Sequence, residues 1–292
     1  MRVKTRLLAS LALILLAATG PLMAQPAPSY TENGFNPRML DASAPRAARL
    51  KLFAQMIALA NSGQVRAQDL AGTFYWQGAG IKGSPVKRDL SQARILLSNA
   101  AVHGDVMAMA KLGELELQAG RLAQAMVWAQ MYARYHDPLA LQRDQRGQDS
   151  AYASNLIKRI TDAGGKIDKA ASKHVGAMVA RFDTSIRRGI DAYNKDRRTG
   201  RTRLVQDPAG VDASENVNVN GMAEYMVAFQ PDGKPGKIWL LDAVPKASMD
   251  DMLRHYLDHA LANSVAESEG TRYLRVSIVH NAQKFRVLRP VH

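Results

Sequence analysis

The sequence predicts an α+β fold, with an N-terminal α-helical hairpin repeat stack followed by a small C-terminal ββαβ domain. Apolar residues recur at three- and four-residue steps through most of the chain, which is the spacing of amphipathic helices. After Gly221 the apolar period changes to two, which is the spacing of strands. The 292 residues suffice for two modest domains, and 47% hydrophobic with 22% charged residues is typical of a globular protein.

The first 24 residues have the layout of a secretory signal peptide. Three basic residues precede a run of Leu, Ala and Ile at 7–18, which Ser10 alone interrupts. Thr19-Gly20-Pro21 then breaks the helix, and Ala24 supplies the small residue that signal peptidase requires. The apolar run is shorter than the roughly 20 residues of a membrane span. We expect cleavage after Ala24 and a periplasmic location; the alternative is an uncleaved N-terminal anchor.

Charge and cysteine content restrict the partners. The formal net charge is +13, and removal of 1–24, with three basic and no acidic residues, leaves 13 − 3 = +10. After export such a charge favours an anionic membrane surface and not nucleic acid; a solvated surface without a specific partner is the alternative. The chain contains no cysteine, which excludes disulfides, cysteine catalysis and a lipid anchor built on cysteine.

Residues 25–45 are expected to form a flexible lead, because four prolines interrupt a segment rich in Ser, Ala and Asn. Regular patterning begins at Arg46 and predicts a helix through Leu59, which Asn61-Ser62-Gly63 ends. The apolar face of this helix consists of Leu50, Phe53, Ala54, Ile57 and Ala58. A helical repeat domain therefore spans 46–194 in this interpretation.

A repeat of 41 residues follows. It separates Ala67 from Ala108 and Gly72 from Gly113, and small residues at fixed places let two helices of a hairpin approach closely. Gly78 and Gly80 are expected to turn the chain between the first two helices, and both are expected to be structurally required. Asp89 marks the start of the returning helix.

At these positions the chain resembles the Sel-one-like repeats, relatives of the tetratricopeptide repeats. The likeness covers about 65–136 and rests on Ala67, Tyr75, Gly78, Gly80, Asp89, Ala93, Ala100, Ala101 and Gly104. The second unit lacks the glycine loop and the aspartate, and it has Glu116 where the tyrosine is expected. The resemblance implies an extended surface for protein recognition. A generic stack of α-hairpins is the alternative.

Two more helices are predicted, at 151–160 and 167–193, before a basic and Asn-rich linker at 195–221. The change of period across this linker predicts that the two parts fold independently. In the second part, 222–292, strands are expected near 225–229, 238–244 and 273–279, with a short fourth at 285–288. A helix is expected to begin at Ser248.

This order resembles the C-terminal domain of TonB, the energy transducer of outer-membrane import. The likeness rests on Phe229, Asp232, Gly233, Ser248, Asp251 and Ala260. TonB itself begins with a membrane anchor and a long Pro-rich spacer, which this sequence does not show. The resemblance therefore implies the domain and leaves energy transduction in doubt.

No strong catalytic motif is present, and we expect neither a catalytic residue, a metal site nor a cofactor. His255 and His259 lie one helical turn apart, as metal ligands can, but a solvated face is the competing interpretation. Glu114 and Glu116 point to different faces of one helix and cannot hold one substrate. The aromatic residues of the repeat helices are expected to pack in the core; the alternative is a peptide-binding groove lined by their exposed members. These residues are Phe74, Tyr75, Trp76, Trp128, Tyr132 and Tyr135.

The sequence thus predicts a non-enzymatic interaction or adaptor protein of the cell envelope. The alternatives are an accessory of TonB-dependent transport and an envelope enzyme with a dispersed site. The expected partners are envelope proteins, with contact to an anionic membrane surface. The candidate docking residues share one side of the third C-terminal strand, taken as an exposed sheet edge. They are Tyr273, Arg275, Ser277 and Val279.

Overall fold

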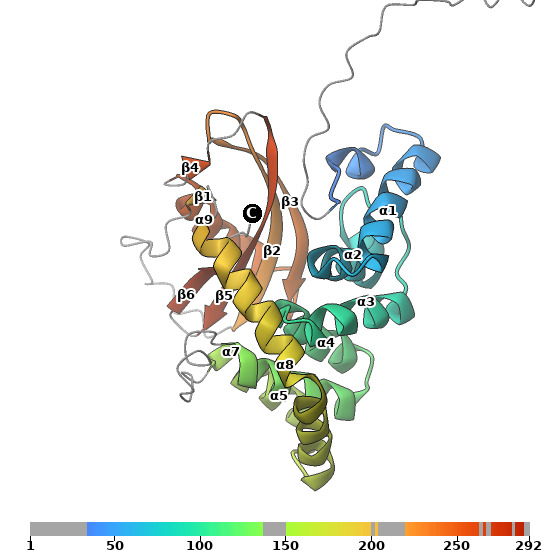
Figure 1. Ribbon diagram of the computed structural model, residues 1–292, viewed down its shortest axis with the longest axis vertical. Coiled ribbons are helices and arrows are strands. Elements are labelled where there is room, and N and C mark those ends of the chain that lie inside the picture. Colours follow the sequence, from blue (N-terminus) through green and yellow to red (C-terminus); the bar gives the residue numbers. More distant parts are fainter. Residues whose placement is uncertain are drawn as a thin grey trace, which may run out of the picture.

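The structure is a computed structural model and describes residues 34–136, 150–199, 202–203, 220–262, 265–266, 270–281 and 284–288. The expected signal peptide and the first part of the expected lead lie outside the described residues. Within them the protein is α+β, as predicted: helices fill the N-terminal part and an antiparallel sheet forms near the C-terminus (Figure 1).

Packed helices follow one another in the N-terminal part. Their bounds are α1 Arg46–Asn61, α2 Val65–Gln77, α3 Leu90–Val102, α4 Val106–Gln118, α5 Leu122–Tyr135, α7 Ala151–Asp162 and α8 Lys169–Thr199. The pairs α2–α3 and α4–α5 are joined by residues 78–89 and 119–121, and the helices of each pair pack against each other. Ala67 and Ala108 are both fully buried, and Gly72 and Gly113 both lie against leucine side chains, so the 41-residue spacing marks equivalent packing positions.

The connection between α2 and α3 requires one of its two glycines. Gly78 has φ +50, and a Cβ built there would lie 2.4 Å from the backbone nitrogen of Arg88. Gly80 has no positive φ and meets nothing closer than 3.4 Å, so the expectation that both glycines are required is wrong for Gly80. Asp89 starts α3 as predicted, since its carboxylate accepts the backbone N–H groups of Ser91 and Gln92.

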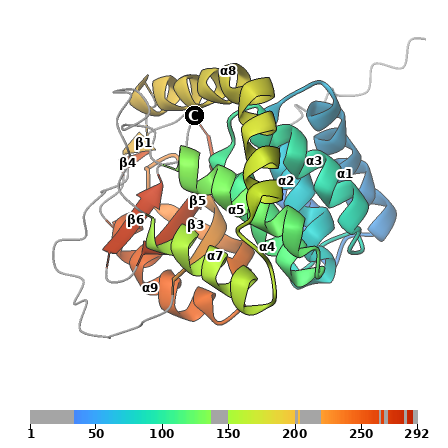
Figure 2. The same cartoon turned by 90° about the horizontal axis from the view of Figure 1, so that it is seen from below.

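A second glycine pair fixes α8 against the stack. Gly104 follows α3 with φ +96, and its backbone touches that of Gly189 in α8. A Cβ on Gly189 would lie 1.8 Å from the carbonyl oxygen of His103, so no side chain fits there. From this contact α8 leads away from the stack toward β1, Thr202–Arg203, which pairs with β4, Val265–Ala266 (Figure 2). The helix therefore extends to Thr199, into the segment expected to be a linker.

The main sheet has the order β3-β2-β5-β6 with every neighbouring pair antiparallel. Its strands are β2 Gly221–Phe229, β3 Pro235–Val244, β5 Arg272–Asn281 and β6 Lys284–Leu288, and α9 is Met249–Ala262. One face packs on α9: Leu274, Val276 and Ile278 share a buried cluster with Leu253 and Leu257, as predicted.

The other face of the sheet packs on the helical stack, so the sheet lies between the stack and α9 (Figure 1). Met222, Val244 and Val279 belong to the main buried cluster of the helices. Met226 and Leu241 belong to the cluster around α1 and α2. The expectation of two independent parts is therefore not supported, because two of the three hydrophobic clusters contain residues of both.

The segment before α1 also joins this core. Phe35 is 1% exposed, and its ring centroid lies 5.6 Å from that of Trp239 and 5.9 Å from that of Tyr273. A short 3-10 helix, η1 Pro37–Leu40, buries Met39 and Leu40. The expectation of a flexible lead is thus wrong for 34–40, because Phe35 packs on β3 and β5 and Met39 and Leu40 lie in the same buried cluster.

Candidate functional site

The predicted docking residues lie between the sheet and the helices, not on a free edge. β5 pairs with β2 on one side and with β6 on the other, so it is an interior strand. Ser277 and Val279 are buried, and Tyr273 and Arg275 are partly covered by the rest of the chain. The expectation of an exposed edge is wrong. The order of strands in the sheet decides which strand lies at an edge, and the alternation of apolar and polar residues along a strand does not reveal that order.

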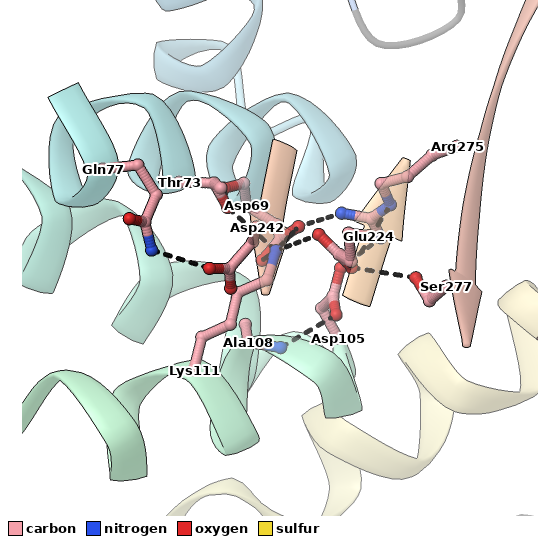
Figure 3. Close-up of polar contacts among 10 residues, drawn as sticks. All are labelled: Asp69, Thr73, Gln77, Asp105, Ala108, Lys111, Glu224, Asp242, Arg275 and Ser277. Atoms are coloured by element: carbon pink, nitrogen blue, oxygen red, sulfur yellow. Dashed lines mark hydrogen bonds and ion pairs between the residues drawn. The ribbon is translucent and has the colours of Figure 1, made fainter. Parts of the chain in front are cut away.

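A cluster of buried charged groups occupies this boundary, which we call the interface cluster: Asp69, Asp105, Lys111, Glu224, Asp242 and Arg275 (Figure 3). Its centre is the ammonium group of Lys111 in α4, which is 0% exposed. The Nζ atom donates to Asp69 at 2.9 Å and to the Thr73 hydroxyl at 2.8 Å, both in α2. It also forms an ion pair with Glu224 of β2.

Arg275 of β5 completes the connection between the two parts. Its guanidinium pairs with Asp69 and donates to the Asp105 carboxylate at 3.1 Å. Glu224 in turn accepts the hydroxyl hydrogen bond of Ser277 at 2.9 Å. Burial lowers the pKa of Arg275 to about 9, with a further lowering from the nearby charge of Arg66, so the group stays a cation at neutral pH.

The interface cluster holds four carboxyl groups against two cations, and burial raises the pKa of two of these carboxyl groups. Burial raises the pKa of Asp242 to about 7, and the charges of Glu224 and Glu114 act in the same direction. One oxygen of Asp242 accepts a hydrogen bond from Gln77 at 2.6 Å. Burial likewise raises the pKa of Asp105, although Asp105 also caps α4 by accepting the N–H of Ala108. Protonation of a buried acid therefore reduces the excess negative charge.

This arrangement suits a structural joint better than a reaction centre. Asp69, Lys111 and Glu224 are each at most 1% exposed, so a substrate cannot reach them without a change of structure. Their hydrogen bonds and ion pairs are made with one another across α2, α4, β2 and β5. Paired burial of this kind holds two elements in one relative position.

Glu114 and Glu116 do point to different faces of α4, as predicted. Glu114 accepts a hydrogen bond from the Tyr152 hydroxyl at 2.8 Å and pairs with Arg159, which ties α4 to α7. Glu116 pairs instead with Arg94 at 2.8 Å and with Arg121 at 3.2 Å. Burial, followed by the charge of Glu114, raises the pKa of Tyr152 well above its ordinary value. Both glutamates therefore stabilise helix packing.

One feature of the sequence could have indicated the interface cluster: two of its charged residues lie on otherwise apolar faces of a helix and a strand. Lys111 lies on the same helical face as Ala108 and Leu115, and Glu224 shares a strand face with Met222 and Met226. A charged residue on an otherwise apolar face predicts a buried partner. The partners themselves lie 42 and more residues away and cannot be read from spacing.

The histidine pair is not gathered into a metal site by the described residues. His255 is exposed, and the side chain of His259 lies outside the described residues. Among the side chains that the structure describes, no group of three or more His, Asp or Glu residues is placed to hold a metal ion.

An apolar groove lies between α5 and the start of α8, and we call it the α5–α8 groove. Its volume is about 390 Å³, within the range of ligand sites. The apolar part of the lining includes Leu122, Val127, Trp128, Ala171 and Met178. Ile167, beside the lining residues Lys166 and Asp168, is 63% exposed. A single exposed apolar side chain is ordinary, so Ile167 adds apolar surface at the rim and does not by itself indicate a ligand.

Most of the aromatic residues pack in the core, as predicted, and one lines the α5–α8 groove. Phe74, Trp76 and Tyr135 are at most 1% exposed, and Tyr132 is 4% exposed. Trp128 is partly exposed and lines the α5–α8 groove. The remaining member, Tyr75, is half-buried and packs edge-on against Phe53.

Comparison with known proteins gives no relative: no family model, no curated protein and no solved structure matches this chain. The likenesses to Sel-one-like repeats and to the TonB domain thus stay proposals. Over the residues that the structure describes, no helix combines the length and hydrophobicity needed to cross a membrane.

Proposed function

We propose that this protein is a non-enzymatic adaptor of the cell envelope that binds a peptide segment of a partner protein in the α5–α8 groove. The observation that carries the proposal is the groove itself, about 390 Å³ in volume, with Trp128 and Met178 among its walls. Aromatic and methionine side chains are enriched where proteins bind one another. Periplasmic export, from the composition of residues 1–24, belongs to the same proposal.

Rigid support favours this groove as a binding site. The hydroxyl of Tyr135 in α5 donates to Asp183 of α8 at 2.6 Å, and Asp183 pairs with Arg187 at 2.8 Å. The Gly104–Gly189 contact fixes the same helix further along. A groove whose walls are held in place loses little entropy when a segment binds.

The transport alternative uses the C-terminal sheet to meet a receptor or transducer segment, but β5, the strand expected to dock a partner, is interior. The enzyme alternative finds its convergent polar groups in the interface cluster, where Asp69, Lys111 and Glu224 are sealed from solvent. Neither alternative draws support from another feature of the described residues.

Selection of binding peptides tests the proposal. A random peptide library displayed on phage is selected against the purified chain, and the affinity of enriched peptides is measured by fluorescence anisotropy. We expect enriched peptides to lose at least about tenfold in affinity with Met178→Glu, which places a charge in the groove. Ile95→Glu is the matched control, because Ile95 is 55% exposed and lies outside the groove lining. Failure to enrich any peptide, or equal binding by both variants, would overturn the proposed function.

A further inference from the structure

The two walls of the α5–α8 groove differ in charge. The α5 wall, 122–128, carries no charged residue. The stretch 163–182, which supplies the other wall, has four basic residues and one acid, a net charge of 4 − 1 = +3 without counting His174. Four cationic or titratable groups cluster at the start of this wall and are all exposed: Lys166, Lys169, Lys173 and His174.

These groups are not neutralised by the part of the protein that the structure describes. No ion pair there involves Lys166, Lys169, Lys173 or His174, while Lys158 nearby pairs with Asp162 at 2.6 Å. Asp168, the one acid of the stretch, has Oδ1 occupied by the N–H of Ala171 at 2.8 Å. Its single negative charge does not balance the three positive charges of Lys166, Lys169 and Lys173.

The cations also lie at an unfavourable end of the helix that carries them. The first turn of α8 contains no acidic residue, and Lys169 and Lys173 lie at its N-terminal end. The positive end of the helix dipole disfavours cations there. A ligand that brings negative charge to this end would relieve both the lysine repulsion and the interaction with the dipole.

We infer that the α5–α8 groove selects acidic segments: an apolar side chain of the partner packs on Trp128 and Met178, while neighbouring Asp or Glu side chains face Lys166, Lys169, Lys173 and His174. The inference rests on the proposed function and adds the chemical class of the partner. The apolar contacts provide most of the affinity, and the charges select among apolar segments and accelerate association.

The peptides enriched in the selection test this inference directly. We expect an excess of Asp and Glu within a few positions of an apolar residue. For the tightest peptide, replacing Asp by Asn and Glu by Gln should weaken binding about tenfold at low ionic strength, the combined effect of a few exposed ion pairs. The difference should shrink as salt is added, because exposed charges are screened.

Charge variants of the protein separate selectivity from binding. Lys166→Gln with Lys173→Gln should weaken the acidic peptide about tenfold and leave its neutral version unchanged. Lys51→Gln with Lys87→Gln removes the same charge from exposed lysines outside the groove and should have no effect on either peptide. Enriched peptides without an acidic excess, or an acidic peptide insensitive to the first pair, would overturn the inference while leaving the proposed function intact. Absence of any enriched peptide would overturn both.

Discussion

The Nζ atom of Lys111 lies 2.9 Å from the Asp69 carboxylate, and neither side chain reaches solvent. This pair connects α2 to α4 inside the helical stack, and Glu224 and Arg275 extend it into the sheet. The two parts of the chain are therefore joined by charge as well as by apolar packing.

Removing the central cation should destabilise the whole protein. Lys111→Met removes the buried cation that Asp69 and Glu224 share and leaves Asp69 with Arg275 and Glu224 with the Ser277 hydroxyl. Breaking a buried ion pair by removing one partner typically costs about 3–5 kcal/mol. Urea denaturation followed by circular dichroism measures the free energy of unfolding. Lys158→Met is the control, since its ion pair with Asp162 is exposed at 70% and 60% and should contribute less than about 1 kcal/mol. Equal small effects of both substitutions would contradict the central role of Lys111.

The two parts should stay together when the chain between them is cut. A protease site inserted between 204 and 219 should give two fragments that co-elute at the mass of the intact protein, because two hydrophobic clusters and the interface cluster connect them. Size-exclusion chromatography checks this. Separate elution of folded fragments would show that the interface is weaker than its buried contacts indicate.

The contribution of Asp242 to stability should fall as pH rises from about 4 to about 7, the range between its pKa values in the unfolded and folded states. The unfolded carboxyl releases its proton near pH ~4, whereas the folded pKa is about 7. The folded state thus binds more protons in this window, and the free energy of unfolding declines with pH by up to ~1.4 kcal/mol per unit. Asp242→Asn cannot ionise, so its stability relative to the unmodified protein should rise from pH 4 to pH 7. A difference independent of pH, measured by urea denaturation, would contradict this.

Two glycines of α8 should respond in opposite ways to alanine. Gly189→Ala places a methyl group against the His103 carbonyl and should destabilise by about 1–3 kcal/mol or more. Gly176→Ala meets nothing within 4 Å and should stabilise by about 0.5–1 kcal/mol, because alanine favours the helix. Melting temperatures of the two variants distinguish these results. A tolerated Gly189→Ala would mean that α8 does not touch the chain after α3.

The α2–α3 loop offers a similar pair. Gly78→Ala should destabilise by about 1–3 kcal/mol, since φ +50 is strained for alanine and the Cβ meets Arg88. Gly80→Ala should change the stability by no more than about 0.5 kcal/mol. Thermal unfolding measures both, and equal effects would refute the assignment of the turn to Gly78.

Sequence periodicity predicted the elements well and their surroundings poorly. The helix expected at 46–59 is Arg46–Asn61, and the expected short fourth strand is Lys284–Leu288. Alternation correctly placed Leu274, Val276 and Ile278 on the face that meets α9. Alternation also placed Arg275 and Ser277 on the opposite face. Polar residues on a strand face predict that this face is exposed to solvent, unless their distant partners are known. Asp69, the partner of Arg275, lies 206 residues away.

The groove was foreseen only in part. Trp128 belongs to the aromatic set that was expected to pack in the core, with a groove lined by exposed members as the alternative. The opposite wall could not be predicted, since α8 reaches α5 by way of the Gly104–Gly189 contact and the hydrogen bond from Tyr135 to Asp183. Neither relationship has a signature in the local sequence.

The interface cluster has a consequence for synthesis. Asp69, Asp105 and Lys111 are made early, but Glu224 and Arg275 emerge only after more than a hundred further residues. Until then Lys111 lies at a surface open to water, which the sheet will later cover. A chain that stops before Arg275 would expose both this surface and the unmatched Asp105 carboxylate. Completion of the fold therefore requires a chain made at least as far as Arg275, and shorter products would be distinguishable to proteases by their open helical face.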